Sequence, residues 1–498
     1  MNRNTYDVDK QHQKGKLHAV ERIELLTDKN SFHEIGSEIT HHCTQFGMES
    51  KPAPYDGVIT GFGTVYGRTV AVFSQDFTVI GGTLGRMHGE KIARLVKSAR
   101  EMNCPVIGIN DSGGARIQEG VNALRGYGDI FYQNTKASGH IPQISIIAGP
   151  CAGGAVYSPG LTDFIFVIDE ISHMFVTGPA VVKQVLFQEV TAHELGGAAM
   201  HASKSGVAHF RSGSEVECYH KVRQLLAIIP HSAYEEPVEF NGHFKRKSQA
   251  RIAKILPDKA NTAYDMYSII YQLIDSGSFI EVMAEYARNM IVGFAKISDM
   301  LVGLIANQPE VMAGVIDCDA GDKTARFVRY CDAYNIPLLT LVDVPGFMPG
   351  KEEEQKGIIR HGAKVLYAYS EAAVPKITVI VRKAYGGAYI AMCSRHLGAD
   401  FVYAWPSAEI AVMGAEGAVN IVYNREIRES VDPEETRNER ITQYNDEYLN
   451  PYLAAKEGYV DEVIEPERTR RIVFESLRFL AGKRASSPAG RRHGNIPL

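Results

Sequence analysis

Two Gly-Gly-Ala segments are the parts of this sequence whose residues and spacing best suit catalysis. Residues 140–155 read HIPQISIIAGPCAGGA and residues 373–388 read AVPKITVIVRKAYGGA, so each segment follows an apolar strand and precedes an expected helix. Glycine lets the main chain turn sharply with its N–H groups uncovered, and such groups at the start of a helix stabilise a developing oxyanion. The alternative is a close-packed strand–helix turn that needs small residues. Because the turn occurs twice, we favour two sites for two partners.

The segment SGGARIQEG (112–120) is the second candidate for ligand binding. Ser112, Gly113 and Gly114 come directly after an apolar strand and can hold a loop against a ligand. Arg116 can bind a phosphate or a carboxylate. The alternative, which the spacing fits equally well, is the capped start of a helix.

Three further motifs fit structural roles better than chemical ones. GFGTVYG (61–67) begins like a dinucleotide fingerprint, but its third glycine comes one place late, which favours a β-hairpin. GGTLGRMHGEK (81–91) resembles a phosphate loop without the GK[ST] ending, which favours a ligand loop or a helix start. Cys151 lies beside the first Gly-Gly turn as a nucleophile would, yet the second turn has no cysteine there, which favours a small buried side chain.

Residues 341–366 form a longer connection between an expected strand and an expected helix. They read LVDVPGFMPGKEEEQKGIIRHGAKVL and combine a strand end, two Pro-Gly turns and an acidic segment. A mobile ligand-binding loop and a plain surface excursion both fit this pattern, and the sequence leaves the two alternatives open.

An internal repeat contains both candidate turns. EMNCPVIGINDSG (101–113) and AYNIPLLTLVDVPG (333–346) each run from a helix end through a proline into an apolar strand that closes on Asp and Gly. The next strand-opening prolines, Pro142 and Pro375, come after nearly equal lengths of chain, and each glycine turn follows its proline after the same length. All these landmarks of the second copy therefore follow those of the first at a nearly constant distance along the sequence. We expect two homologous halves.

Each half is expected to consist of βα units. Apolar runs such as VIGIN and ISIIAG are typical of strands buried on both faces, and residues 91–101 and 362–372 have helical periodicity. Repeated βα units imply mostly parallel sheets and an α/β fold. The polar stretch 231–262 is the expected linker, and we place the domains at residues 1–240 and 241–498.

Composition limits the classes of function. The 498 residues are 45% hydrophobic and 22% charged, which is ordinary for a globular protein and excludes disorder and coiled coil. A net charge of −5 excludes a generally basic nucleic-acid binder. No apolar run reaches the ~18–20 residues of a membrane span, and the first sixteen residues lack a signal-peptide core, so we expect a cytoplasmic protein. Seven cysteines without CxxC spacing argue against disulfides and a cysteine-rich zinc site, and we expect no metal in this chain.

Read together, the motifs resemble those of one family. The chain is similar to the carboxyltransferase component of biotin-dependent acyl-CoA carboxylases in six segments, which are DSGGARIQEG, GPCAGGAVYSP, DVPGFMPG, RKAYGGAY, GADFVYAWPSAEIAVMGAEGA and a terminal HGNIPL. The nearest type is the propionyl-CoA carboxylase β subunit. The corresponding subunits of methylmalonyl-CoA decarboxylase and of transcarboxylase are also similar.

The resemblance implies an architecture and a set of partners. It implies two duplicated crotonase-like (ClpP/crotonase) domains, each a ββα superhelix, in a homohexamer built from dimers. It further implies that the first domain holds the acyl-CoA and the second the biotin, and that the active site lies between the first domain of one subunit and the second domain of its partner. The implied partners are a biotin carboxylase and a biotin carrier subunit, since the sequence has no Met-Lys-Met biotinylation turn and no ATP-binding domain. We expect no nucleic-acid partner and no direct membrane insertion.

The resemblance also implies a reaction. Carboxybiotin on a separate carrier releases CO2, its ureido group removes the α-proton of a short-chain acyl-CoA, and the enolate attacks CO2. Propionyl-CoA going to methylmalonyl-CoA is the expected conversion, with acetyl-CoA as another substrate. Two backbone oxyanion holes match the two enolates. The implied catalytic residues are Gly153, Gly154, Gly387 and Ala388. The implied acyl-CoA contacts are Ser112, Gly113, Gly114, Ala115, Arg116, Ala152, Tyr157 and Ile390, and the implied biotin contacts are Phe347, Tyr385 and Gly386.

One position departs from the family pattern. Propionyl-CoA carboxylases commonly carry Asp directly after RKAYGGAY, where this chain has Ile390. The related decarboxylase and transcarboxylase subunits carry an aliphatic residue there, so acyl preference and direction of flux stay open. The second hypothesis is a methylmalonyl-CoA decarboxylase or transcarboxylase subunit working in the reverse direction, with a membrane decarboxylase subunit as partner in the first case. A non-catalytic scaffold is the third, and the intact turns argue against it.

Overall fold

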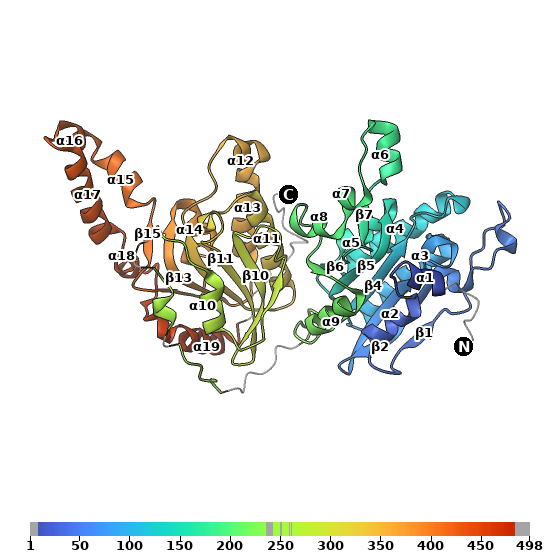
Figure 1. Ribbon diagram of the computed structural model, residues 1–498. Coiled ribbons are helices and arrows are strands. Elements are labelled where there is room, and N and C mark those ends of the chain that lie inside the picture. The colour runs from blue at the N-terminus through green and yellow to red at the C-terminus, as the bar shows by residue number, and fades with distance from the viewer. Residues whose placement is uncertain (1–7, 236–242, 250, 258, 260, 484–498) are drawn as a thin grey trace, which may run out of the picture. The chain divides into compact units, whose positions relative to one another are not determined.

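The computed structural model describes residues 8–235, 243–249, 251–257, 259 and 261–483 (Figure 1). The chain divides into two compact units, with the division between residues 236 and 237. The sequence placed the division between residues 240 and 241, in the same short stretch. The terminal HGNIPL lies outside the described residues.

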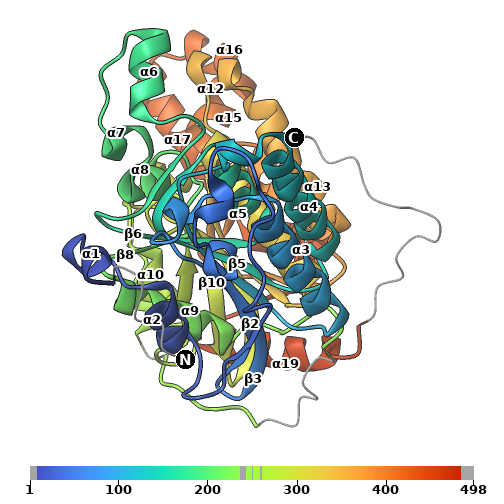
Figure 2. The same cartoon turned by 90° about the vertical axis from the view of Figure 1, so that its right-hand side faces the viewer.

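Within residues 8–235 the first unit is built on one eight-stranded sheet (Figure 2). The strand order is β1-β2-β3-β4-β5-β6-β8, with β7 paired to the end of β5. The pairs β1–β2 and β2–β3 are antiparallel and the others are parallel, so the expectation of a mostly parallel sheet is confirmed. The strands are β1 His33–Ile35, β2 Val58–Val65, β3 Arg68–Gln75, β4 Val106–Ser112, β5 Gln143–Ala152, β6 Phe164–Ile168, β7 His173–Phe175 and β8 Phe210–Ser212.

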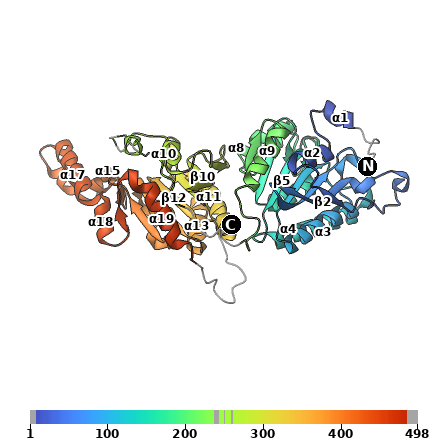
Figure 3. The same ribbon diagram turned by 90° about the horizontal axis from the view of Figure 1, so that it is seen from below.

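Over its described residues the second unit repeats this sheet strand for strand. Figure 3 labels two of its strands, β10 and β12. Its order is β9-β10-β11-β12-β13-β14-β16, with β15 paired to β13. Strand β12 follows β4 along the chain at almost the same distance as β13 follows β5, so the internal repeat is confirmed. The strands are β9 Ile280–Val282, β10 Met290–Ile297, β11 Met300–Asn307, β12 Leu338–Val344, β13 Lys376–Tyr385, β14 Phe401–Ala404, β15 Glu409–Ala411 and β16 Glu462–Val463.

Helices cover both faces of each sheet. In the first unit α3 and α4 lie on one face and α2 and α9 on the other (Figure 2). The helices of this unit are α1 Val8–Gln13, α2 Ala19–Leu26, α3 Arg86–Glu101, α4 Val121–Ala137, α5 Tyr157–Leu161, α6 Pro179–Leu186, α7 Ala192–Gly196, α8 Ala198–Ser203 and α9 Glu215–Leu226. Those of the second unit are α10 Met266–Leu273, α11 Cys318–Ala333, α12 Lys351–Lys356, α13 Ile358–Glu371, α14 Gly386–Ala391, α15 Ala415–Val422, α16 Asn424–Glu429, α17 Pro433–Tyr448, α18 Pro451–Lys456 and α19 Thr469–Leu480. Among the described residues, no helix combines the length and the apolar character that a membrane crossing needs.

Helix α3 shows how sequence spacing and close packing build the first core. Its buried side chains recur every three or four residues and include His88, Ile92, Leu95 and Ala99. The apolar ones, Ile92, Leu95 and Ala99, join a core with residues of β4 and β5. A Cβ on Gly89 would lie 2.5 Å from the Cα of Gly126 on α4, so glycine at both positions lets the two helices approach closely. The expected helix over 91–101 is confirmed within α3, and the one over 362–372 is confirmed within α13, which ends at residue 371.

The predicted hairpin is confirmed, and the long connection differs from its prediction. Val65 pairs with Arg68 across a two-residue turn, and Tyr66 and Gly67 have φ +50° and +75°, which this kind of hairpin turn needs. The acidic part of the 341–366 segment was expected to lead into a helix. It forms a separate short helix, α12, that ends at the left-handed Gly357 before α13 begins.

Candidate functional site

The first Gly-Gly-Ala turn joins β5 to the single 3-10 turn Gly153–Val156 and then to α5. Gly153 has φ +61°, which side chains rarely adopt, so this position needs glycine. Gly154 has no room for a side chain, because a Cβ there would lie 2.9 Å from the ring of Tyr127. The N–H groups of such a first turn have no carbonyl of their own helix to bind, and they can donate to an oxyanion.

The second turn has the same form between β13 and α14. Gly386 has φ +57°, and a Cβ there would lie 3.0 Å from the carbonyl oxygen of Val412. Gly387 is more open, since the nearest atom to a Cβ would be a ring carbon of Phe347 at 3.7 Å. Ala388 is fully buried.

The two turns occupy equivalent places in the repeat. Gly153 corresponds to Gly386 and Gly154 to Gly387. The expected donor pairs, Gly153 with Gly154 and Gly387 with Ala388, therefore differ by one position between the two copies.

The predicted acyl-CoA loop lies against the first turn. Strand β4 ends beside β5, and a Cβ on Gly114 would lie 3.1 Å from the carbonyl oxygen of Ala152. The Ser112 hydroxyl donates to the carbonyl of Gly82 (2.7 Å) and accepts from the N–H of Gly114 (3.1 Å), so its hydrogen bonds hold the loop. Gly113 is the exposed residue of this loop. The structure thus brings the two predicted segments together, with Ser112 turned inward.

Arg116 requires a correction. Its side chain is fully buried between Asp56 (2.5 Å) and Glu119 (2.8 Å), and it also donates to the carbonyl of Thr83. The carboxylates that it binds belong to the protein itself, and at 1% exposure its guanidinium lies inside the protein instead of at a ligand surface. The neighbouring Ala115 is half-buried and bridges to the strand-like segment before α3. Neither Asp111 nor Ser112 caps a helix, because a short 3-10 turn begins at Ile117 and α4 begins at Val121 with Gly120 as its N-cap.

Cys151 has the environment of a packing residue. It is fully buried, and its thiol donates to the carbonyl of Ala155 at 3.0 Å. Burial raises the pKa of the Cys151 thiol, which disfavours the reactive thiolate. The interpretation of Cys151 as a small buried side chain is confirmed.

A row of aromatic rings connects the first turn with the surface. Tyr127 stacks on Phe131 (5.9 Å between ring centres), and Phe131 meets Tyr157 edge to face (6.3 Å). Tyr157 is 52% exposed on α5, where a ligand can reach it. Sequence reasoning missed Tyr127, for which the only signal was its helical spacing of four from Phe131.

The predicted biotin contacts gather at the second turn. Phe347 bridges to Ile316, and its ring lies beside Gly387 and beside Gly362 of α13. The Tyr385 hydroxyl donates to the carboxylate of Glu409 on β15. Burial and the neighbouring Glu409 raise the pKa of Tyr385, so it stays a neutral donor.

Ile390 lies on α14, in the turn of helix that follows Gly387. It is 38% exposed, which excludes a role as a core residue. Its side chain therefore reaches the surface, on the same short helix as Gly386, a predicted biotin contact.

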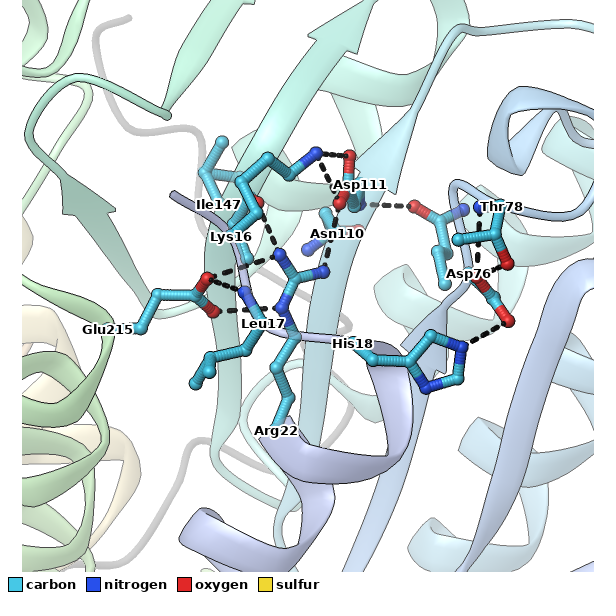
Figure 4. A network of polar contacts seen from close by, with 12 residues as sticks. Lys16, Leu17, His18, Arg22, Asp76, Thr78, Asn110, Asp111, Ile147 and Glu215 are labelled. Carbon is cyan, nitrogen blue, oxygen red and sulfur yellow. Dashed lines mark hydrogen bonds and ion pairs between the residues drawn. The ribbon is translucent and has the colours of Figure 1, made fainter. Parts of the chain in front are cut away.

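A charged network behind the first turn was not anticipated (Figure 4). Asp111, at the end of β4, accepts from Lys16 (2.7 Å) and from Arg22 (2.9 Å). Arg22 also binds Glu215 of α9 (2.8 Å) and the carbonyl of Ala148 on β5 (2.7 Å). All these side chains are buried, so the network ties the N-terminal segment to the strands that carry the first turn. Among the described residues, no group of three or more His, Cys, Asp or Glu side chains could hold a metal ion.

Comparison with known proteins gives one consistent relationship. The carboxyl transferase domain matches residues 10–496. Methylmalonyl-CoA decarboxylase subunit alpha of Propionigenium modestum is 53% identical over 492 residues, which are 99% of this chain and 95% of that protein. The propionyl-CoA carboxylase carboxyltransferase subunit of Haloferax mediterranei is also 53% identical, over 98% of this chain and 95% of that protein.

A solved structure agrees with these relatives. The crystal structure of transcarboxylase 12S, described as a hexamer with methylmalonyl-coenzyme A bound, has a TM-score of 0.95 and 49% identity. The match covers 99% of this chain and 94% of that chain. The likeness confirms the two-domain crotonase-like fold expected from the sequence.

Proposed function

The chain belongs to the carboxyl transferase domain family, and on that premise we propose that it is the carboxyltransferase subunit of a biotin-dependent enzyme. Its reaction moves a carboxyl group between carboxybiotin on a carrier protein and the α-carbon of a short-chain acyl-CoA. The expected conversion is that of propionyl-CoA and methylmalonyl-CoA, with acetyl-CoA as another acceptor.

The duplicated turn is the observation that carries this proposal. The reaction develops negative charge on two oxygens, one on the thioester and one on the biotin ureido group. Two sets of main-chain donors at the ends of β5 and β13 match that demand, because backbone N–H groups fixed in a turn need no rearrangement to receive a developing charge. We assign Gly153 and Gly154 to the thioester oxygen, and Gly387 and Ala388 to the biotin oxygen.

The surroundings of the second turn fit biotin. The ring of Phe347 offers a flat apolar surface beside Gly387, and Tyr385 is held in place by Glu409. Carboxybiotin supplies the carboxyl group and, after losing it, the base for the α-proton. The chain's own task is to hold the two reactants in line and to stabilise two oxyanions, which fits the backbone character of both turns.

The direction of the reaction has two candidates. Carboxylases and decarboxylases are equally similar to this chain, at 53% identity each. If the enzyme is a carboxylase, the partners are a biotin carboxylase subunit and a biotin carrier subunit. If it is a decarboxylase, a membrane decarboxylase subunit takes the place of the biotin carboxylase subunit. We propose a homohexamer in either case, as in transcarboxylase 12S.

Turnover with a purified biotin carrier and a panel of acetyl-, propionyl- and butyryl-CoA tests the proposal. We expect carboxyl transfer to at least one of the three when the carrier holds carboxybiotin, and the reverse transfer from the matching malonyl-type ester. Absence of transfer in both directions, in a chain that retains its fold, would overturn the proposed function.

A further inference from the structure

Asp111 and Asp343 occupy equivalent positions in the two units. Each lies at the end of the central strand of its sheet, β4 or β12, and each is fully buried. The main-chain N–H of Asp111 donates to the side chain of Gln75 (3.1 Å), and that of Asp343 donates to Asn307 (3.2 Å). Gln75 and Asn307 are themselves equivalent, since each is the last residue of the strand before, β3 or β11. The two units therefore keep the same buried carboxylate at the same point, just before the loop that approaches the glycine turn.

The second unit binds its carboxylate from the adjacent strand. Asp343 accepts from the guanidinium of Arg382 (3.0 Å) and from the main-chain N–H of Lys383 (3.1 Å), both on β13. When the two glycine turns are aligned, the equivalent residues on β5 are Gly149 and Pro150. Glycine has no side chain and proline has no N–H, so β5 can provide neither donor.

The first unit obtains its donors from the N-terminal segment instead. Helices α2 and α10 are equivalent, with His18 and Asp265 as their N-caps. Counted from these caps, Lys16 and Arg22, which bind Asp111, correspond to the uncharged Ala263 and Ile269. The cation that binds the buried carboxylate thus lies on strand β13 in the second unit, whereas in the first unit the cations lie on α2 and just before it.

Gly149 explains why the first unit cannot use both sources. A Cβ at this position would lie 2.0 Å from a carboxylate oxygen of Asp111 and 2.6 Å from the Lys16 nitrogen. The space that the first side-chain atoms of Arg382 occupy in the second unit is thus filled by the carboxylate and the lysine in the first. The two arrangements therefore exclude one another at this position of the strand.

The network connects directly to the first turn. Arg22 binds both Asp111 and the carbonyl of Ala148, so it ties the end of β4 to β5 a few residues before the first turn. The chain continues from Asp111 into the loop whose Gly114 lies against Ala152, the residue before Gly153. A shift of Asp111 therefore moves the loop and the turn relative to each other.

We propose that Lys16 and Arg22 are positioning residues for the first oxyanion hole, and that they replace the strand donors that position the second. The inference rests on the proposed function, which assigns the first turn to the thioester. Loss of Lys16 removes one of the two cations that bind Asp111 and leaves Arg22 to balance both Asp111 and Glu215, and buried carboxylates tolerate such a shortage of positive charge poorly. The ends of β4 and β5 then lose their fixed relation, although the sheet itself remains.

The test compares two CoA analogues on the full chain. A CoA nitronate carries negative oxygens like those of the thioester enolate, and a CoA thioether of the same length lacks them. We expect Lys16→Met to weaken nitronate binding by about tenfold relative to thioether binding, since displaced oxyanion donors lose part of a contribution of ~10²–10³. Lys16→Arg, which keeps the charge, should restore most of the preference.

Two further variants separate positioning from general damage. Arg223 binds Asp28 (2.9 Å) and the carbonyl of Leu26, so it also anchors the end of α2, and among the described residues none of its hydrogen bonds or ion pairs reaches Asp111, Lys16 or Arg22. Arg223→Met should lower the melting temperature and leave the nitronate preference intact. Arg382→Met should also leave it intact, because that residue serves the second unit.

The outcomes are distinguishable. A wild-type chain that binds both analogues equally would contradict the thioester assignment of the proposed function. A wild-type chain that prefers the nitronate, with the same preference in Lys16→Met, would overturn the present inference alone. If Lys16→Met does not fold, Lys16→Gln is measured in its place, and an unchanged preference there has the same meaning.

Discussion

The ring of Tyr127 lies so close to Gly154 that a Cβ on this glycine would stand 2.9 Å from a ring carbon. In the second unit a Cβ on the equivalent Gly387 would lie 3.7 Å from a ring carbon of Phe347, which is an ordinary van der Waals contact. Tyr127 of α4 thus packs tightly against the first turn, whereas Phe347, in the loop after β12, leaves more space beside the second. The two turns have the same sequence, Gly-Gly-Ala, and different tolerance for an added methyl group.

That difference can be measured with a matched pair of variants. Gly154→Ala should destabilise the first unit by ~1–3 kcal/mol, the usual cost of forcing a group into a packed site, while Gly387→Ala should fold as the wild type does. Urea denaturation of both variants gives the comparison. Equal stability of the two variants would contradict the packing of Tyr127 described above.

Larger side chains test the two oxyanion holes themselves. Gly154→Val and Ala388→Val should each lower turnover by ~10² or more, because they displace or cover main-chain donors. Circular dichroism and the oligomeric state must show that each variant is folded before its rate is compared. Near-normal rates in both folded variants would refute the assignment of two holes.

The chain should need partners for ATP-dependent carboxylation. Its sequence contains no Met-Lys-Met turn for biotin attachment. We expect the purified chain to decarboxylate a malonyl-type CoA when free biotin is supplied, and to show no ATP-dependent carboxylation. Release of labelled CO2 measures the first reaction and ATP hydrolysis the second. Sustained ATP-dependent activity of the chain alone would contradict its place as one component of a larger enzyme.

Cys151 should be dispensable for turnover. Its thiol is fully buried and its pKa is raised by burial, so the thiolate is scarce at neutral pH. Cys151→Ala should keep turnover within about threefold of wild type, since a nucleophile would instead cost orders of magnitude. Iodoacetamide should label Cys43, the one cysteine of the seven that is not buried, well before the others. Inactivation at the rate of labelling at Cys151 would restore the nucleophile hypothesis.

The repeat and the turns could be predicted because they depend on local sequence. Prolines, apolar runs and glycines at regular intervals report strands and turns that recur with the same spacing. The close approach of Gly89 and Gly126 could not be predicted in this way, because nothing in either helix shows which residue it meets. The side-chain partner of a glycine is a property of the packed fold.

The partners of the charged side chains around the first turn could not be predicted from the sequence. Arg116 lies in a motif that suggested ligand binding, yet its guanidinium forms a buried ion pair with Asp56, which lies much earlier in the sequence. Lys16 and Arg22 lie in no motif, and only the fold brings them to Asp111. A sequence motif indicates which residues a site needs, whereas the distribution of buried charge depends on contacts between distant segments.

Ile390 offers the sharpest test of acyl specificity. It follows Gly387 on α14, and at 38% exposure it can accept a carboxylate without burying it unpaired. Ile390→Asp should therefore fold, whereas a carboxylate at a fully buried position would unfold the domain. An aliphatic side chain packs against a short alkyl chain, and a carboxylate there holds water in the same space.

We expect Ile390→Asp to change the relative activity with different acyl-CoA substrates without abolishing any of the activities. A methylene in an apolar pocket is worth ~1–3 kcal/mol, so Ile390→Asp should change the ratio of kcat/KM among acetyl-, propionyl- and butyryl-CoA by roughly tenfold or more. Ile390→Leu, which keeps an aliphatic group of equal size, should leave the ratio near that of the wild type. Carrier-dependent activity should survive in both variants, because neither touches the main-chain donors of the turn. An unchanged ratio in a folded, active Ile390→Asp variant would remove this residue from the acyl pocket, and the preference of the chain would then depend on the first turn and its loop at Gly113.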